Sequence, residues 1–304
     1  MKKKKWVFFL FCFLTSVACI EFYMRSYWGF CDTILMRVDN DYEYIAQPNQ
    51  DRFRFRHKIF YNEYSMRSKP LSTSDSIRIL GFGDSVINGG TQTDNDSLAT
   101  SLIENHLCNQ LGISIRCLNI SAGSWGPDNC FAYLKKHGNF GADIIFLVIS
   151  SHDAYDNMDF EKIVGEHVSF PTHQYSLAIA ELFDQYLIPW LKGIIKYGGG
   201  KNEDDPISKE DVFNSGIINF FDYSVEHNIP FFIYLHPEIT EVRLDKYNDQ
   251  GQRIISFCKE HNICLLKGLD YEINESMYRD VIHLNEKGQR FLMNQLLNKI
   301  NEII

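Results

Sequence analysis

The chain has 304 residues, of which 45% are hydrophobic, so it is long enough to bury a sizeable core in one large α/β domain or two small ones. Lys and Arg number 30 against 39 Asp and Glu, a formal net charge of −9. This balance argues against nucleic acid as the main partner, because phosphate binding relies on clustered Lys and Arg.

The first 24 residues are expected to be a signal anchor or a signal peptide rather than part of the fold. Four lysines at 2–5 precede fifteen uncharged residues, 6–20, and Glu21 ends the run. The run suits a signal-peptide core, and extension to Met24 would make a short membrane anchor. The lysines predict a cytoplasmic start with the rest of the chain outside the cytoplasm, on the periplasmic side. Three fates stay open, in this order: an anchor, a lipoprotein cleaved within 16–19, and a secreted protein.

Residues 25–76 predict a stalk followed by short strands or a hairpin packed on the main domain. They lack long helical periodicity and are rich in aromatic residues: Tyr42, Tyr44, Phe53, Phe55, Phe60 and Tyr61. The basic stretch 52–58 alternates with period two, which predicts a strand with its aromatic residues facing inward and its arginines in solvent.

A main domain is expected over residues 77–304, where strand and helix patterns alternate. Strands are predicted at 77–82, 114–120, 143–150, 229–235 and 263–267, and helices near 97–109, 128–137, 245–261 and 286–302. This alternation predicts a doubly wound, flavodoxin-like parallel sheet of about five strands.

A helical insertion is expected over residues 151–228, because this stretch is far longer than a crossover needs. It contains an apolar helix around 175–197, a glycine turn at 198–200, an acidic loop at 203–205 and a second helix around 209–227. The insertion leaves the sheet directly after His152, which favours a lid or a wall of the substrate site. A plain helical elaboration is the alternative.

Ser85 follows the first strand of the predicted sheet. Ile79, Leu80 and Phe82 predict a strand buried on both faces, and the run stops at Gly-Asp-Ser. Ligands of open α/β sheets bind outside the carboxyl ends of the strands, so this hydroxyl is expected to face a ligand. The alternative is an ordinary turn.

Asp280 and His283 follow the last predicted strand. A serine is a poor nucleophile until a base takes its proton, and the base works best when a carboxylate holds its tautomer. Both residues can reach the edge of the sheet at which Ser85 lies. The alternative is a loop that ends in a helix cap at Asn285. His236, after the fourth strand, is interpreted as a packing or loop residue.

With these two stretches the chain resembles the SGNH, or GDSL-type, hydrolase family over residues 60–304. Residues 82–85 are similar to the first block of the family and 280–283 to its last. Residues 118–129 are similar to the second block, in which a backbone amide, here of Gly123 or Ser124, helps to form the oxyanion hole. The third block of the family ends in Gly-x-Asn-Asp, whereas this chain has Ser150-Ser151-His152-Asp153.

The resemblance implies a serine ester hydrolase that removes or transfers an acetyl or short acyl group on an exported carbohydrate or another small ester. It implies Ser85 as nucleophile, His283 as base and Asp280 as its orienting carboxylate. Amides of Ser85 and of Gly123 or Ser124, with the side chain of His152, would hold the oxyanion. The alternative for His152 is that it turns away to pair with Asp153 or Asp156. No cofactor or metal is implied. The altered third block supports an alternative, a non-catalytic carbohydrate-binding or polysaccharide-assembly protein with a degenerate site.

The eight cysteines form no metal-binding pattern, since no Cys-x-x-Cys occurs and the histidines are scattered. Cys108 with Cys117, and Cys258 with Cys264, could each close a small loop in an oxidising compartment. Free thiols are the alternative.

Overall fold

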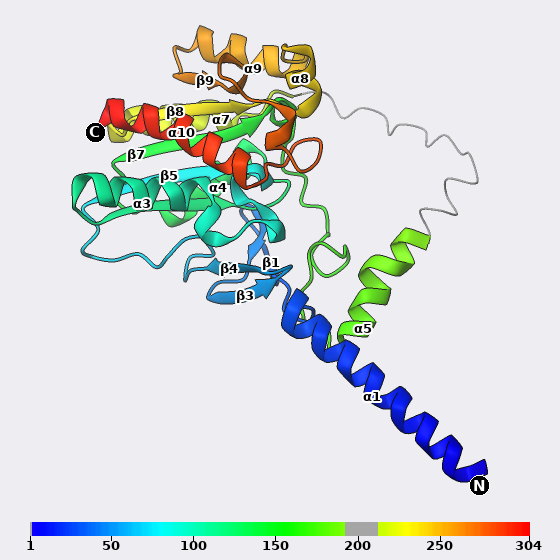
Figure 1. The fold of residues 1–304 in the computed structure, drawn as a ribbon. Helices are drawn as coiled ribbons and strands as arrows, with labels where there is room; N and C mark the ends of the chain where they lie inside the picture. Colours follow the sequence, from blue (N-terminus) through cyan, green and yellow to red (C-terminus); the bar gives the residue numbers. More distant parts are fainter. Residues whose placement is uncertain (1, 192–211) are drawn as a thin grey trace.

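The computed structural model describes residues 2–191 and 212–304 (Figure 1). The predicted glycine turn at 198–200 and acidic loop at 203–205 lie outside the described residues. So do the end of the first predicted insertion helix and the start of the second.

A five-stranded parallel sheet forms the centre of the body. Its order is β6-β5-β7-β8-β9, the flavodoxin-like order in which the first strand of the sheet lies second (Figure 1). The strands are β5 (Ile77–Gly83), β6 (Ile115–Ser121), β7 (Ile144–Ser150), β8 (Phe231–His236) and β9 (Leu265–Lys267). Each lies within two residues of its predicted bounds, so the predicted doubly wound sheet is confirmed.

Helices cover both faces of the sheet, because alternate strand residues point to opposite sides. On one face Ile79, Phe146 and Phe232 pack against α3 (Ala99–Leu111) and α10 (Glu286–Ile303). On the other face Leu80, Leu147 and Ile233 pack against three more helices: α4 (Pro127–His137), α7 (Gly216–His227) and α9 (Asp249–Glu260). The central strand β7 is buried along its whole length, as its unbroken apolar sequence predicts.

Shorter elements lie mainly at the strand ends. They are α2 (Ser85–Asn88), α8 (Ile239–Leu244), the 3₁₀ turns η1 (Gly90–Gln92), η2 (Asn95–Ser97), η3 (Ser151–Ala154), η5 (Gly268–Asp270) and η6 (Glu275–Met277), and, in the insertion, α5 (Ala178–Glu181) with the π-helical η4 (Leu182–Leu187). Residues 188–191 continue the helix of η4, while residues 157–177 form no helix or strand.

The N-terminal part consists of a long helix and two antiparallel hairpins. Helix α1 (Lys2–Trp28) projects from the body with the N-terminus at its outer end (Figure 1). Within it, the stretch Lys4–Trp28 is long and apolar enough to cross a membrane. The hairpins pair β1 (Met36–Asp39) with β2 (Glu43–Ala46), and β3 (Gln50–Arg54) with β4 (His57–Tyr61).

The prediction of one strand over 52–58 was wrong. Phe55 and Arg56 have positive φ angles of 48° and 70° and form the tight turn between β3 and β4. Arg54 is not in solvent but fully buried, where its guanidinium pairs with Glu181. An alternating pattern says nothing of such a turn, because the turn here uses neither glycine nor asparagine.

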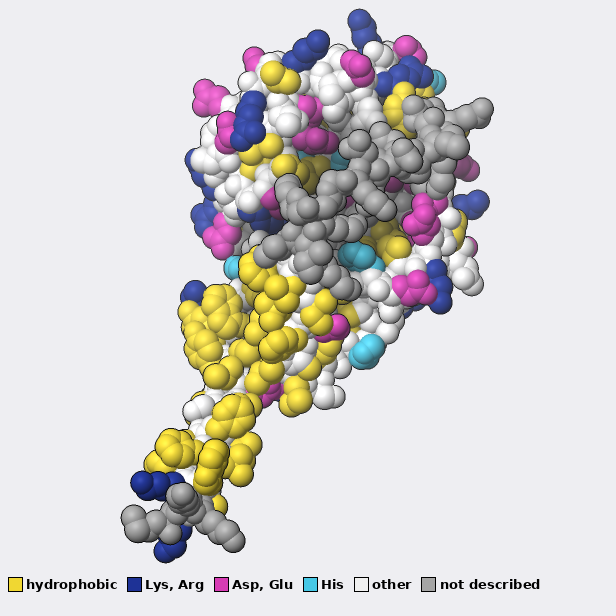
Figure 2. Space-filling model, turned by 90° about the vertical axis from the view of Figure 1, so that its right-hand side faces the viewer, with side chains coloured by type: hydrophobic (Ala, Val, Ile, Leu, Met, Phe, Trp, Pro, Cys, Tyr) yellow, Lys and Arg dark blue, Asp and Glu magenta, His cyan; other side chains and the backbone are white. Residues whose placement is uncertain are grey.

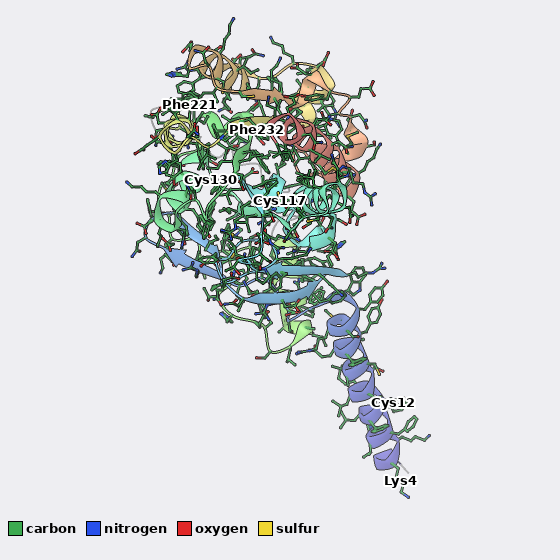
Figure 3. The ribbon with its side chains drawn as sticks, turned by 90° about the vertical axis from the view of Figure 1, so that its left-hand side faces the viewer. Lys4, Cys12, Cys117, Cys130, Phe221 and Phe232 are labelled. Carbon is green, nitrogen blue, oxygen red and sulfur yellow. The ribbon has the colours of Figure 1, made fainter. Side chains whose placement is uncertain are left out.

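All eight cysteines are free, so neither of the two possible disulfides is present and the alternative of free thiols describes the structure. Cys117 and Cys130 lie among the side chains of the body, whereas Cys12 lies on the projecting helix α1 (Figure 3).

Candidate active site

The end of β5 presents the hydroxyl of Ser85 at the edge of the sheet. Gly83 packs so closely on β7 that a Cβ there would lie 2.5 Å from the carbonyl oxygen of Val148. Asp84 caps the short helix α2, because its carboxylate accepts a hydrogen bond of 2.8 Å from the amide of Val86. Ser85 is therefore the first residue of a helix that starts directly at the strand end.

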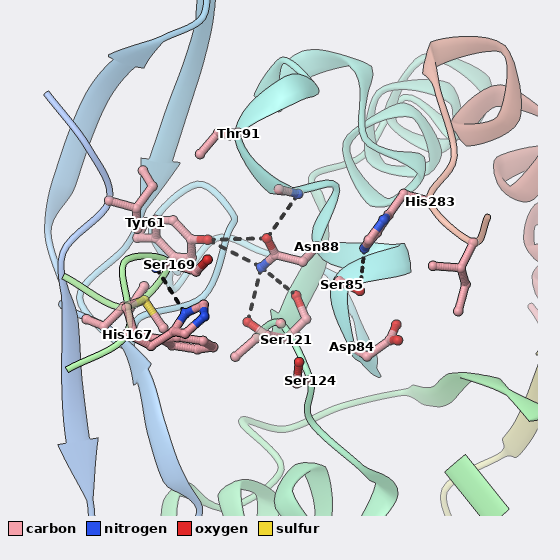
Figure 4. A pocket seen from close by; sticks show the side chains of 18 of the residues that line it. Tyr61, Asp84, Ser85, Asn88, Thr91, Ser121, Ser124, His167, Ser169 and His283 are labelled. Atoms are coloured by element: carbon pink, nitrogen blue, oxygen red, sulfur yellow. Dashed lines mark hydrogen bonds between the residues drawn. The ribbon is translucent and has the colours of Figure 1, made fainter. Parts of the chain in front are cut away.

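Ser85, His283 and Asp280 form one chain of hydrogen bonds. The Nε2 atom of His283 lies 2.9 Å from Oγ of Ser85 (Figure 4). On the other side of the ring, Nδ1 of His283 lies 2.8 Å from Oδ2 of Asp280. This Asp280 carboxylate also accepts the amides of His283 at 2.8 Å and Ile282 at 3.1 Å. Burial alone would raise the pKa of Asp280, but these amides and the imidazole outweigh burial and lower it.

A buried histidine supports the loop that carries His283. Nε2 of His236 lies 2.8 Å from the carbonyl oxygen of Ile282 and donates to it, while Nδ1 is buried and has no hydrogen-bond partner among the described residues. Burial lowers the pKa of His236 to about 4. His236 thus lies behind the loop and outside the chain of Ser85 and His283, in agreement with its interpretation as a packing residue.

The loop after β6 brings two further backbone amides to the same place. Gly123 and Ser124 line the cavity at Ser85, and Ser124 has a left-handed φ of 59°. The hydroxyl of Tyr44, from β2, donates to the carbonyl oxygens of Gly123 at 2.9 Å and Ser124 at 3.2 Å. Within the described part of the chain, no hydrogen bond uses the amide N–H of Ser85, Gly123 or Ser124. These three donors are free to bind a ligand.

Buried polar side chains fix the loops on either side of Ser85. Nδ2 of Asn88 donates to Oγ of Ser121 at 3.1 Å and lies 3.3 Å from the hydroxyl of Tyr61 (Figure 4). The fully buried guanidinium of Arg67 donates to three backbone carbonyls at the end of α2 and in the turn after it: those of Asn88, Gly90 and Thr93. Backbone satisfaction of this kind holds the turn in one conformation.

His152 lies at the end of β7 and lines the same cavity. Its Nδ1 atom lies 3.3 Å from Oε1 of Glu238, whereas Nε2 has a carboxylate, that of Asp153, only at 3.9 Å. Burial alone would lower the pKa of His152, but the hydrogen bond to Glu238 and the nearby charges of Asp153 and Asp84 raise it to about 10. A raised pKa favours the imidazolium form of His152, in which Nδ1–H faces Glu238 and Nε2–H lies on the other side of the ring.

Glu238 is the residue that the sequence analysis missed. The prediction named Asp153 or Asp156 as partners if His152 turned away from the oxyanion, but the partner of Nδ1 is Glu238. Its signal in the sequence was position alone: it follows His236 and Pro237 at the carboxyl end of β8, the strand paired with β7.

A possible metal-binding group lies beside His152. Ligand atoms of Asp84, His152 and Asp153 fall within 4.8 Å of one another. The Asp84 and Asp153 carboxylates already accept backbone amides, of Val86 and of Ser150 respectively. Burial raises the pKa of both carboxyls and the nearby His152 opposes this rise, so a protonated His152 and a metal ion would compete for the same two carboxylates.

The cavity at Ser85 has a volume of about 620 Å³. Its floor contains Ser85 and His283, and its walls come from two remote parts of the chain. Met36, Ala46 and Tyr61 belong to the N-terminal hairpins, and His167, Ser169 and Phe170 to the insertion (Figure 4). The part of the insertion before residue 177 therefore forms a wall of the cavity.

No known protein-family profile and no curated protein matches this sequence. Solved structures with a similar chain path include a putative lipolytic protein of the G-D-S-L family from Desulfitobacterium hafniense, at 11% identity over 73% of this chain and 99% of that one, with a TM-score of 0.41. The psychrotrophic esterase EstA from Pseudoalteromonas is 10% identical over 74% of this chain and 97% of that one, with a TM-score of 0.43. An acetylxylan esterase from Geobacillus stearothermophilus is 13% identical over 76% of this chain and 96% of that one, with a TM-score of 0.40.

All three are described as lipolytic proteins or esterases. At this level of identity and TM-score, the function of this chain has to be inferred from the side chains and amides of its own site.

Proposed function

We propose that the protein is a serine ester hydrolase whose nucleophile is Ser85. The observation that carries the proposal is the hydrogen-bonded chain Ser85–His283–Asp280, with contacts of 2.9 and 2.8 Å, at the floor of a cavity of about 620 Å³. A serine, a base and a carboxylate in this order are what acyl transfer needs.

In the proposed reaction Oγ of Ser85 attacks the acyl carbon while Nε2 of His283 takes the hydroxyl proton. His283 then gives this proton to the leaving alkoxide, and an acyl-enzyme remains on Ser85. Water attacks the acyl carbon in the second half, again deprotonated by His283, and releases the acid and the free serine. Asp280 holds Nδ1–H of the imidazole and stabilises the imidazolium that forms twice in the cycle.

The negative oxygen of the tetrahedral intermediate would be held by the amides of Ser85 and of Gly123 or Ser124, which no other bond within the described chain uses. Nε2–H of His152 is proposed as a further donor, in the position that an asparagine has in the resembled family. A cationic donor would stabilise the oxyanion more strongly than an amide.

The proposed substrate is an acetyl or short acyl ester on a carbohydrate outside the cytoplasm. This finer assignment is supported by the resemblance of the sequence blocks and by the apolar helix α1, which could act as signal or anchor. With a sugar hydroxyl in place of water, the same residues would transfer the acyl group.

A fluorophosphonate probe tests the proposal on the full chain in detergent. We expect labelling of the wild type, none in Ser85→Ala and at least a 10²-fold slower reaction in His283→Ala, since a general base contributes about 10²- to 10⁴-fold. Asp280→Asn should retain more reactivity than His283→Ala. Ser114→Ala, which changes an exposed serine bonded to Asp75, is the matched control and should label normally. Equal labelling of wild type and Ser85→Ala would refute the role of Ser85, and no labelling of the wild type would favour a non-catalytic protein.

The leaving group is tested by acetate release from an O-acetylated xylo-oligosaccharide and from 4-nitrophenyl acetate. Release from both, lost together in Ser85→Ala, supports the carbohydrate assignment. Release from the nitrophenyl ester alone would contradict the carbohydrate assignment and indicate a hydrolase of other small esters.

A further inference from the structure

The helical segment 177–191 of the insertion exposes large apolar side chains. The exposed fractions range from 36% for Leu182 to 61% for Trp190, and the set comprises Leu177, Leu182, Phe183, Ile188, Trp190 and Leu191. Hydrophobic side chains run from the projecting helix α1 onto the adjoining surface of the body (Figure 2). A patch of this kind on a monomer marks an interaction site.

The first turn of this segment is fixed to the body. Glu181 is fully buried, where its carboxylate pairs with Arg54 and accepts the amide of Cys31 at 2.6 Å. Ala178 is buried against Met24 and Phe30. The segment is therefore held in one orientation, with its apolar residues turned outward.

Hydrogen bonds also attach the start of the segment to α1 near the C-terminal end of that helix. The carboxylate of Glu21 accepts the amides of Ala178 at 2.7 Å and Ile179 at 3.0 Å, and Arg25 donates to the carbonyl of Ser176 at 2.5 Å. Polar bonds between the two helices thus lie in the last two turns of α1.

The same end of α1 carries exposed aromatic residues: Tyr23, Tyr27 and Trp28, with Tyr23 and Tyr27 stacked at 5.1 Å between ring centroids. Tyr and Trp are enriched where membrane-spanning helices leave the hydrocarbon region for the headgroups. If α1 spans a membrane, this level is the interface between membrane and water. Segment 177–191 leaves α1 at that level and points in a different direction (Figure 1).

We propose that segment 177–191 is a second membrane contact, a helix that lies on the surface of a phospholipid bilayer beside the α1 anchor. Its apolar side chains would enter the boundary between headgroups and acyl chains, as those of interfacial helices do. The partner is lipid rather than another protein, because the patch continues the apolar surface of α1 and begins at its interfacial end.

The contact also bears on the substrate, a point that rests on the proposed function. A second cavity of about 280 Å³ is lined by Gln185 and Tyr186 of this helix and by Thr91 and Ser169, which also line the cavity at Ser85. The two cavities share these two residues, so the cavity at the lipid-facing helix adjoins the one that contains the nucleophile. The substrate would be an ester presented at the bilayer surface.

Fluorescence quenching tests the contact on the full chain in vesicles of phosphatidylethanolamine and phosphatidylglycerol. The contribution of Trp190 to the tryptophan fluorescence is the difference in emission between wild type and Trp190→Phe. We expect lipids brominated near the top of their acyl chains to quench most of it. The contribution of Trp125, which is 1% exposed inside the body, is obtained from Trp125→Phe and should be unaffected. Quenching of Trp190 by aqueous iodide and not by the brominated lipid would overturn the proposal.

Activity separates this proposal from the proposed function. The double variant F183E/W190E should hydrolyse soluble 4-nitrophenyl acetate at the wild-type rate, which also shows that it is folded. It should lose at least tenfold on the acetate ester of a long-chain alcohol embedded in the same vesicles. V225E alters an equally exposed apolar residue on α7, at 65% exposure, and should change neither rate. Unchanged hydrolysis of the embedded ester by the double variant would refute a role of this surface in substrate delivery. Ser85→Ala tests the proposed function separately, because it should abolish hydrolysis of both esters.

Discussion

At the scale of single residues, His152 is the point at which the site departs from the resembled family. Its imidazole lines the cavity of Ser85, with Nδ1 held by Glu238 and Nε2 at 3.9 Å from the carboxylate of Asp153. We expect His152→Ala to lower kcat about 10²- to 10³-fold, because loss of one oxyanion donor typically costs this much. His152→Asn, which keeps an N–H donor, should retain much of the activity on 4-nitrophenyl acetate. Near-wild-type turnover in His152→Ala would exclude the role.

We expect Glu238 to act as a positioning residue for His152, with an effect that is visible in a pH profile. The hydrogen bond to Glu238 raises the pKa of His152, so the cation persists until the pH rises through about 10. Glu238→Gln removes the charge that favours the imidazolium, and the pKa of His152 should fall. The alkaline decline of kcat should therefore begin at lower pH in Glu238→Gln than in the wild type, whereas a merely structural role would lower kcat evenly at every pH.

His236 makes a separate prediction about stability. Its pKa is about 4 in the folded chain because it is fully buried, whereas an unfolded histidine titrates near 6.5. Between these values the unfolded state binds more protons, so folding is stabilised above about pH 6.5 and this contribution is lost as the pH falls to 4. The loss amounts to about 3 kcal/mol, since one pKa unit corresponds to about 1.4 kcal/mol.

His236→Gln, which can still donate to the carbonyl of Ile282, should show a flatter dependence of the free energy of unfolding on pH between 4 and 6.5. Urea titrations at several pH values measure it. Parallel curves for wild type and variant would contradict this origin of the acid sensitivity.

The sequence could predict which residue types meet at the site, but not all of their partners. Ser85, Asp280 and His283 follow strands whose carboxyl ends share one edge of the sheet, so their proximity follows from topology. Glu238 meets the same criterion, yet nothing in the sequence separates a carboxylate that faces a neighbouring loop from one in solvent.

At the scale of elements, the buried pair Arg54–Glu181 ties the hairpin of β3 and β4 to the helix of the insertion. Their side chains are 2% and 0% exposed. Arg54→Met or Glu181→Gln alone leaves one buried charged group without its main partner and should cost about 3–5 kcal/mol of the free energy of unfolding. The double variant R54M/E181L removes both charges and should be markedly more stable than R54M. Equal destabilisation in R54M and the double variant, measured by denaturant unfolding, would contradict this explanation.

The elements that sequence patterns predict best are those whose burial is complete. The five strands of the central sheet were predicted because unbroken apolar runs such as that of β7 occur where helices cover both faces. Within this hairpin the stretch 52–58 was predicted as one strand, because the turn is made by Phe55 and Arg56 and Arg54 is buried by a partner 127 residues away. The alternation of neighbouring residues cannot predict a pair whose members lie so far apart in the sequence.

At the scale of the whole molecule, the cavity is assembled from segments that precede and interrupt the sheet domain. The sheet supplies Ser85 and His283, while the N-terminal hairpins and the insertion supply the walls. The edge of the sheet thus holds Ser85 and His283, while segments outside the sheet shape the cavity around them. It also means that the N-terminal hairpins belong to the site, although the sequence predicted them only as a packed appendage of the main domain.

The orientation of the chain across a membrane is the prediction that concerns all of these parts together. Four lysines at 2–5 precede the apolar part of α1, and loops rich in Lys and Arg remain in the cytoplasm. If α1 is an anchor, the cavity and its walls lie outside, where an exported carbohydrate is accessible. Protease added to intact spheroplasts should then digest the body of the chain, while a cytoplasmic marker protein stays whole. Digestion only after lysis would reverse the topology. The Cys19→Ala variant separates an anchor from a lipoprotein. An unchanged, membrane-bound band supports the anchor, whereas accumulation of a larger precursor supports a lipoprotein. For the wild type, a shortened chain in the soluble fraction supports secretion.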